Sequence, residues 1–241
     1  MTEHQADPAP VVLLHGWGGT YQTTWSGSVL ERRLRAAGRT VAGLDLPGHG
    51  PGPVSHEPKD YELIASQLAV ILPDAVVMDG VGFSLGGKLL LQLAADHPGR
   101  FRRLVIGGVG ANLFRPENGE ATSKALLEGL APDAPPVLRS VIEEARASGN
   151  DPLGLSAVIR RPPRTVTPED LRAIRAAVLL VVGTDDGIAG PLGPLADSLP
   201  RARTAVVEGL DHTSTPSSPE FQDLALAFLC PSSIMTPGES E

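Results

Sequence analysis

Ser84 is the residue whose type and setting most directly suggest chemistry. It lies within Gly-Phe-Ser-Leu-Gly at positions 82–86, after an apolar run and before a leucine-rich stretch with helical spacing. This pattern places the serine in a tight turn between a strand and a helix. The flanking glycines leave room where a Cβ would collide in so sharp a turn. The sequence therefore predicts that Ser84 is an exposed nucleophile, close to helix amides that can stabilise an oxyanion.

A serine hydroxyl is a weak nucleophile and needs a nearby base, which a third group must orient. Two segments further along the chain contain suitable residues. The sequence Gly-Thr-Asp-Asp ends at Asp186, and Gly-Leu-Asp-His ends at His212. Each follows a strand-like apolar run, so a serine, an acid and a histidine occur in that order just after three different strands. This order is the one found with nucleophile elbows.

Six apolar runs alternate with helical patterns and predict the elements that position these residues. Such alternation is typical of an α/β protein with a mostly parallel sheet and helices on both faces. In a parallel sheet the carboxyl ends of the strands share one edge, so the three residues are expected to converge there. The expected strands are 11–14, 40–44, 75–81, 104–106, 177–182 and 204–207, and the expected helices are 25–37, 61–72, 85–96, 191–199 and 219–229.

No strand pattern occurs between residues 111 and 172. Three helix-like segments at 120–130, 136–148 and 152–160 are bordered there by Pro and Gly, which predicts a helical insertion over one edge of the sheet. We expect a core made of residues 1–110 and 173–230, a helical cap at 111–172, and a disordered tail at 231–241, which is polar and rich in Pro and Ser.

Over residues 11–229 the chain resembles the α/β-hydrolase superfamily. His15-Gly-Trp-Gly-Gly resembles its oxyanion loop, Gly-Phe-Ser-Leu-Gly-Gly its nucleophile elbow, and the segments ending at Asp186 and His212 its acid and histidine loops. The resemblance implies that Ser84 is the nucleophile, that His212 acts as base and then acid, and that Asp186 orients the imidazole. Asp185 is the alternative acid, although the Gly-x-x-Asp spacing favours its neighbour.

The oxyanion hole is expected to consist of backbone amides. Leu85, directly after the nucleophile, supplies one donor, and the resemblance implies Trp17 as the other. The side chains of Trp17 and Phe83 are candidate pocket walls, and His15 is expected to brace its loop. The basic run at 160–164 could bind an anionic substrate, but a solvated charge run is the favoured interpretation.

Composition and charge exclude several classes of function. The 241 residues carry a net charge of −8, which argues against a nucleic-acid partner. The chain contains no membrane-spanning apolar run and no signal-peptide pattern at its start, so we expect no membrane association. The single cysteine, Cys230, fits a cytoplasmic location and inert packing. We find no pattern for a metal or cofactor and expect none, and the oligomeric state is not predicted.

These observations predict a cofactor-free serine hydrolase that cleaves a small-to-medium carboxylic ester, thioester or lactone through an acyl-enzyme. Carbon–carbon bond hydrolysis, or a lyase or synthase reaction with the same three residues, is the alternative, because the fold hosts several chemistries. A non-catalytic binding module is a third hypothesis, and the intact set of Ser84, Asp186 and His212 argues against it.

Overall fold

The computed structural model describes residues 9–75, 77–115, 117, 119–162 and 164–231. Its centre is a sheet in which the described residues form six strands, all paired in parallel in the order β2-β1-β3-β4-β5-β6. The carboxyl ends of the strands therefore lie along one edge, as expected. The strands are β1 (Val11–Leu14), β2 (Val41–Leu44), β3 (Met78–Phe83), β4 (Phe101–Gly107), β5 (Ala177–Gly183) and β6 (Ala202–Val207).

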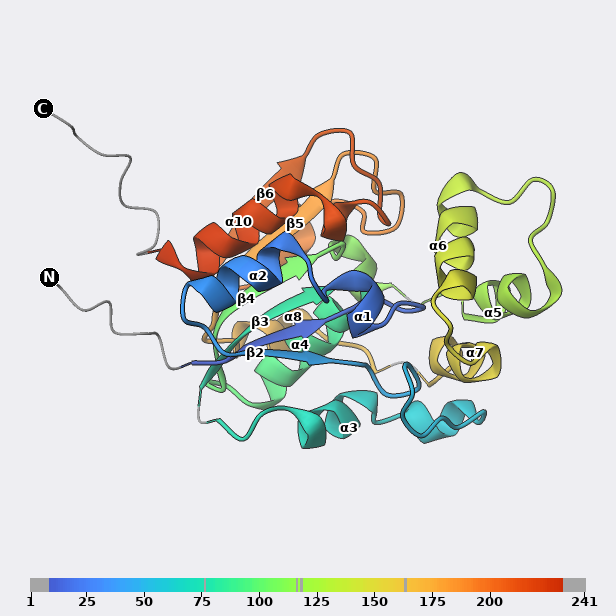
Figure 1. Ribbon diagram of the computed structural model, residues 1–241, viewed down its shortest axis with the longest axis horizontal. Coiled ribbons are helices and arrows are strands. Elements are labelled where there is room, and N and C mark those ends of the chain that lie inside the picture. Colours follow the sequence, from blue (N-terminus) through green and yellow to red (C-terminus); the bar gives the residue numbers. More distant parts are fainter. Residues whose placement is uncertain (1–8, 76, 116, 118, 163, 232–241) are drawn as a thin grey trace, which may run out of the picture.

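Helices cover both faces of the sheet (Figure 1). On one face, α2 (Val29–Ala36) and α10 (Pro219–Leu229) pack on alternate strand residues such as Val11 and Val81. On the other face lie α3 (Ile64–Ile71), α4 (Leu85–Asp96), α8 (Pro168–Arg172) and α9 (Gly193–Ala196), which contact the intervening strand residues. The central strands β1, β3 and β5 thus bury both of their faces, which explains why they are nearly continuous apolar runs, whereas the edge strand β6 is largely exposed.

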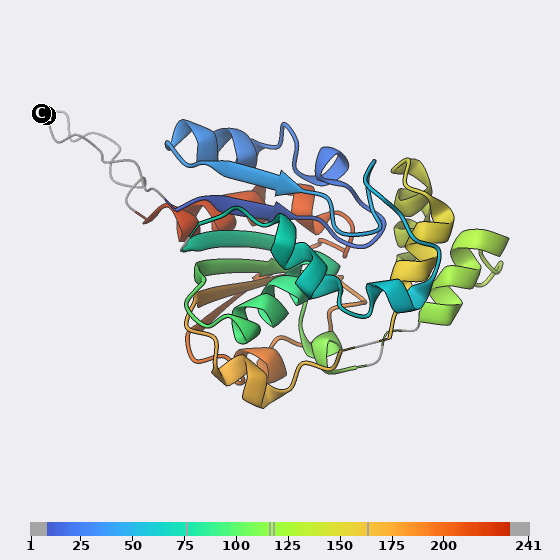
Figure 2. The same cartoon turned by 90° about the horizontal axis from the view of Figure 1, so that it is seen from below.

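Three further helices stand together beyond the carboxyl edge of the sheet (Figure 2). These are α5 (Gly119–Glu128), α6 (Pro136–Ala147) and α7 (Pro152–Ile159), and they share a small apolar core of their own that includes Ile142 and Leu155. Trp17 contacts both this core and the core on the α4 face of the sheet. Its indole nitrogen donates to the Leu155 carbonyl at 2.9 Å, which links α7 to the loop after β1.

Residues at both ends of segment 111–172 pack on the sheet rather than on these three helices. Leu113, in the 3-10 turn η2 (Ala111–Phe114), and Leu171, in α8, both belong to the core on the α4 face. The expected cap therefore contains a compact group of three helices whose flanking turns belong to the main body. Of the expected disordered tail, residues 232–241 lie outside the described residues.

Several element boundaries differ from the sequence prediction. The strand expected at 75–81 begins at Met78 and extends to Phe83, because β1 pairs with β3 only from Val11 and Asp79 onward. The helix expected at 25–37 is replaced by α1 (Tyr21–Thr24) and α2, since Gly27 has a positive φ of 69° and Ser28 caps the second helix. The helices expected at 61–72 and 191–199 are shorter, and 3-10 turns η1 (Pro58–Tyr61) and η3 (Thr215–Ser217) occur elsewhere.

A buried ion-pair network lies at the opposite, amino-terminal edge of the sheet. Asp79 in β3 is fully buried and accepts hydrogen bonds from the guanidinium groups of Arg39 and Arg102, each at 2.6 Å, and from the Arg103 amide. Arg39 also donates to the carbonyls of Ala9 and Leu229. The network connects the start of the sheet to the end of α10. None of the described helices is long and apolar enough to span a membrane.

Candidate active site

Ser84 occupies a strained turn between β3 and α4. Its φ of +49° and ψ of −114° lie in a region that L-residues rarely adopt, at a cost of about 1–3 kcal/mol. Two backbone hydrogen bonds stabilise this conformation: the Ser84 amide donates to the Gly107 carbonyl at 2.8 Å, and the Lys88 amide donates to the Ser84 carbonyl at 2.9 Å. The turn requires glycine nearby, because a Cβ on Gly82 would lie 2.7 Å from the Gly86 carbonyl oxygen.

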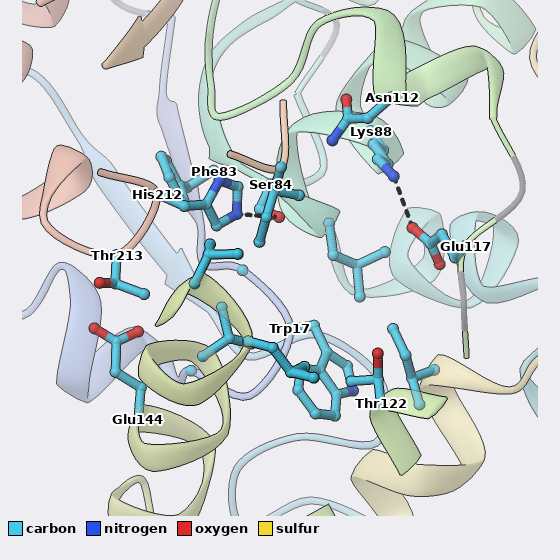
Figure 3. Close-up of a pocket in the computed structure, with 18 of the residues that line it drawn as sticks. Trp17, Phe83, Ser84, Lys88, Asn112, Glu117, Thr122, Glu144, His212 and Thr213 are labelled. Atoms are coloured by element: carbon cyan, nitrogen blue, oxygen red, sulfur yellow. Dashed lines mark hydrogen bonds and ion pairs between the residues drawn. The ribbon is translucent and has the colours of Figure 1, made fainter. Parts of the chain in front are cut away.

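The structure brings Ser84, His212 and Asp186 together from three separate strand ends (Figure 3 shows the first two). His212 Nε2 lies 3.0 Å from the Ser84 hydroxyl oxygen. On the other side of the ring, Nδ1 lies 3.0 and 2.9 Å from the two carboxylate oxygens of Asp186. The side chains of His212 and Asp186 are 6% and 1% exposed, so water competes little for these hydrogen bonds.

The environment of Asp186 keeps its carboxylate ionised. Burial alone would raise the pKa of this carboxyl, but the hydrogen bond and charge of His212 lower it, as do the Ala189 and Ile188 amides that donate to Oδ1. Asp185, the alternative acid, is exposed, and its carboxylate accepts from the Thr184 hydroxyl. Asp211 accepts from the amides of its own loop. Of the three acids, Asp186 is therefore the one placed against the histidine.

The loop after β1 passes beside Ser84 at the start of α4. A Cβ on Gly16 would lie 3.3 Å from the Ser84 Cβ, and the Gly86 amide donates to the His15 carbonyl at 3.1 Å. Both Trp17 and Leu85 line the cavity at this point. Among the described residues, the backbone amides of Trp17 and Leu85 donate to no backbone carbonyl outside the regular elements. The oxyanion hole formed by these two amides stays a prediction.

Two buried histidines brace this loop as neutral rings. His15 Nε2 accepts from the Leu46 amide at 3.1 Å, and His49 Nε2 accepts from the Gly18 amide at 3.1 Å. Burial lowers the pKa of His15 to about 4 and that of His49 to about 3, and the neighbouring His15 charge contributes to the second shift. A neutral ring is required here because an accepting nitrogen cannot carry a proton.

A cavity of about 410 Å³ opens above Ser84, between the sheet edge and helices α5–α7. This volume is in the range of small-molecule sites. Phe83 and Trp17 both line it, and the Phe83 ring also packs on His212 with ring centres 5.0 Å apart. The helices contribute mainly aliphatic side chains, namely Val137, Leu138, Val141 and Ile159.

Sequence reasoning missed a set of polar residues that line the same cavity: Lys88, Asn112, Arg115, Glu117 and Glu144. Lys88 had one detectable signal, since it interrupts an apolar helix one turn after the nucleophile. The others are recognisable only in three dimensions. The basic run at 160–164 is also not uniformly solvated, because Arg161 has a side chain only 12% exposed and pairs with Glu117 at 3.3 Å.

Comparison with known proteins agrees with this fold. Residues 11–222 match the model of the alpha/beta hydrolase family. The chain therefore belongs to the alpha/beta hydrolase family. An enol-lactonase from Burkholderia xenovorans LB400 has the same fold, with a TM-score of 0.73 and 22% identity over 94% of this chain and 93% of that one.

Two curated relatives are more similar in sequence. A pimeloyl-acyl-carrier-protein methyl ester esterase of Neisseria meningitidis serogroup C is 30% identical over 227 residues, which cover 84% of this chain and 86% of the relative. The esterase of the same name from Aromatoleum aromaticum is 31% identical over 244 residues, which cover 87% of this chain and 93% of the relative.

Proposed function

We propose that this protein is a serine hydrolase that cleaves a small-to-medium carboxylic ester, thioester or lactone through an acyl-enzyme on Ser84. The observation that carries this proposal is the continuous hydrogen-bonded chain from the Ser84 hydroxyl through His212 to the buried Asp186, at the floor of a cavity of small-molecule size. The esterase activity named for the two relatives supports the same reaction class.

The reaction proceeds in two halves. In the first, His212 Nε2 takes the Ser84 proton while the serine oxygen bonds to the carbonyl carbon, and the carbonyl electron pair moves onto its oxygen. The tetrahedral intermediate then collapses, the bond to the leaving oxygen or sulfur breaks, and His212 gives its proton to that atom. In the second half, His212 takes a proton from water while the water oxygen bonds to the acyl carbon. The bond to the Ser84 oxygen then breaks, His212 gives that proton to the serine oxygen, and the acid product leaves.

Asp186 and the backbone amides stabilise the charges that form during these steps. The Asp186 carboxylate holds His212 in the tautomer that leaves Nε2 free to accept, and it stabilises the imidazolium. The amides of Trp17 and Leu85 bind the oxyanion. Each such donor typically contributes about 2.7–4 kcal/mol to the transition state.

Helices α5–α7 form the cap that determines the substrate. They contribute most of the aliphatic cavity lining, and their position over Ser84 excludes water from one side of the acyl group. The substrate is a small molecule or a small ester group carried on a larger one. The cytoplasmic location indicated by the single cysteine stays a prediction.

The test uses short p-nitrophenyl esters and a fluorescent phosphonate that labels serine nucleophiles. We expect the wild type to turn over the esters and to be labelled, and Ser84→Ala to lose both. Ser26→Ala is the matched control, because Ser26 does not line the cavity. Turnover of the natural substrate that survives Ser84→Ala would refute the acyl-enzyme and favour histidine-based lyase chemistry. If the wild type shows neither labelling nor ester turnover, the proposed ester hydrolysis is refuted.

A further inference from the structure

Charged groups that ester hydrolysis does not use gather at one end of the active-site cavity. Lys88 on α4 forms an ion pair with Glu117 at 2.8 Å, and Arg161 pairs with the other oxygen of the same carboxylate at 3.3 Å. Burial would raise the pKa of Glu117, but the Lys88 and Arg161 charges outweigh that effect and lower it, so the carboxylate is ionised. Arg115 also lines this cavity, and together with Lys88, Glu117 and Arg161 it lines an adjoining one. Three cations therefore lie near one anion.

Two donors at this end have no partner within the described residues. Arg115 forms no hydrogen bond or ion pair there, although it lines both this cavity and an adjoining one of about 190 Å³. The amide nitrogen of Asn112 is buried without an acceptor. Its orientation is determined by the Gly110 amide, which donates to the Asn112 amide oxygen at 3.0 Å and leaves the nitrogen turned toward the cavity (Figure 3). A buried donor without a partner favours a ligand that supplies an acceptor.

This end of the cavity is the acyl side of the proposed reaction. His212 must reach the leaving atom, so the leaving group lies toward His212 and Thr213, and the acyl chain extends the other way. Lys88, Asn112 and Glu117 lie on one side of Ser84 in Figure 3, while Thr213 and Glu144 lie on the opposite side. Lys88 is one helical turn beyond Ser84, a rise of about 6 Å along α4. A short acyl chain therefore spans the distance between them.

The two ends of the cavity differ in charge. Glu144 on α6 lines the leaving-group end, where it forms no ion pair with any described residue. A second negative charge there, on the leaving group, is disfavoured by repulsion. The acyl end has an excess of positive charge, and aliphatic side chains such as Val141 and Ile159 also line the cavity. This pattern fits a methylene chain with an anion at its far end and a neutral alcohol as leaving group.

We propose that the acyl part of the substrate ends in a carboxylate, so that the enzyme acts on half-esters of dicarboxylic acids. The inference rests on the proposed ester hydrolysis at Ser84. Arg115 and the Asn112 amide nitrogen bind the terminal carboxylate, because a guanidinium offers paired donors to a planar anion. Lys88 supplies a third donor, since an ammonium has three protons and Glu117 accepts only one of them. Arg161 holds Glu117, and through it Lys88, in place.

The test compares two substrates of equal size that differ in charge, monomethyl adipate and methyl adipamate, with the glutarate and suberate homologues to locate the preferred length. We expect wild-type kcat/KM to be about tenfold or more higher for the carboxylate, as for a charge-assisted hydrogen bond. Arg115→Gln and Asn112→Leu each reduce this ratio, mainly through KM. Arg175→Gln, which removes an exposed arginine outside the cavity, leaves the ratio at its wild-type value.

Each outcome separates the two proposals. Equal kcat/KM for the charged and neutral esters, or a preference that survives both Arg115→Gln and Asn112→Leu, overturns the carboxylate subsite while ester hydrolysis stands. Labelling of Ser84 by the phosphonate confirms that each variant is folded and active. If no ester is hydrolysed and Ser84 is not labelled in the wild type, the proposed function itself has failed.

Discussion

Replacing Asp186 by asparagine tests the assignment of the acid most sharply, because the change removes a charge and almost no volume. In the wild type, Oδ1 accepts from the amides of Ile188 and Ala189, both at 2.9 Å, while Oδ2 lies 2.9 Å from His212 Nδ1. Asparagine keeps the oxygen that the two amides require. Its NH₂ group then faces the Nδ1–H of His212, so two hydrogen-bond donors point at each other.

Oδ1 also lies 3.0 Å from Nδ1, but it already accepts from the two amides, so we expect the imidazole to relieve the conflict by moving its proton. Nδ1 then accepts from the new amide, and Nε2 carries the hydrogen. A protonated Nε2 cannot accept the Ser84 proton across the 3.0 Å contact. An imidazole held in the wrong tautomer lowers kcat on the order of 10⁴-fold, which corresponds to about 5.5 kcal/mol of transition-state stabilisation. Rotating the amide by half a turn does not remove the conflict, because the NH₂ would then face the backbone amides of Ile188 and Ala189, which are also donors.

The assay is kcat/KM for a short p-nitrophenyl ester, with Asp185→Asn as the matched control. Asp185 is exposed and has no contact with His212, so we expect that variant to stay within about twofold of wild type. Thermal unfolding of both variants shows whether a loss of activity reflects a loss of fold. If Asp186→Asn keeps a tenth of the wild-type rate, or if Asp185→Asn loses as much, the assignment of the acid is wrong.

Three further predictions concern the framework around the site. Gly86→Ala should lower kcat/KM about 10²-fold, because its Cβ would lie 2.5 Å from the His15 carbonyl oxygen and displace the elbow, whereas Gly52→Ala, with open space around it, should be neutral. Asp79→Asn should lower the free energy of unfolding by about 3–5 kcal/mol in urea titrations, since it removes the buried carboxylate charge that pairs with Arg39 and Arg102. The depressed pKa values of His15 and His49 mean that the unfolded chain binds more protons below about pH 6.5, so stability should fall by up to about 1.4 kcal/mol per pH unit per histidine from there toward pH 4. Urea midpoints between about pH 7.5 and pH 5 measure this, and His49→Gln should make the dependence shallower.

Other results would contradict these expectations. Equal effects of the two glycine substitutions would mean that the close approach of the loop after β1 does not constrain the elbow. An Asp79→Asn variant with wild-type stability would show that the network at the amino-terminal edge contributes little net free energy. Urea midpoints that do not change with pH, or that change equally in His49→Gln, would show that the buried rings are not the groups that take up protons on unfolding.

The order of elements was predictable because buried parallel strands leave a strong local pattern. The central strands are covered by helices on both faces, so runs such as 177–183 are apolar throughout. Boundaries were less predictable, since they depend on partners. Arg102 and Arg103 interrupt the apolar pattern, yet β4 begins at Phe101, because Arg102 pairs with Asp79 and the Arg103 amide donates to the same carboxylate. No local pattern reveals a partner more than twenty residues away.

Ser84, Asp186 and His212 could be proposed from the sequence alone because strand ends, turn glycines and chain order are local features, and a parallel sheet necessarily gathers its strand ends at one edge. Only the geometry shows that Asp186, rather than Asp185, contacts the histidine, since adjacent side chains diverge. The tertiary structure also decided what the cavity contains. Lys88, Asn112 and Glu117 come from different elements, and the Lys88–Glu117 pair joins residues 29 apart in the chain. Their significance arises only when folding places them around one space.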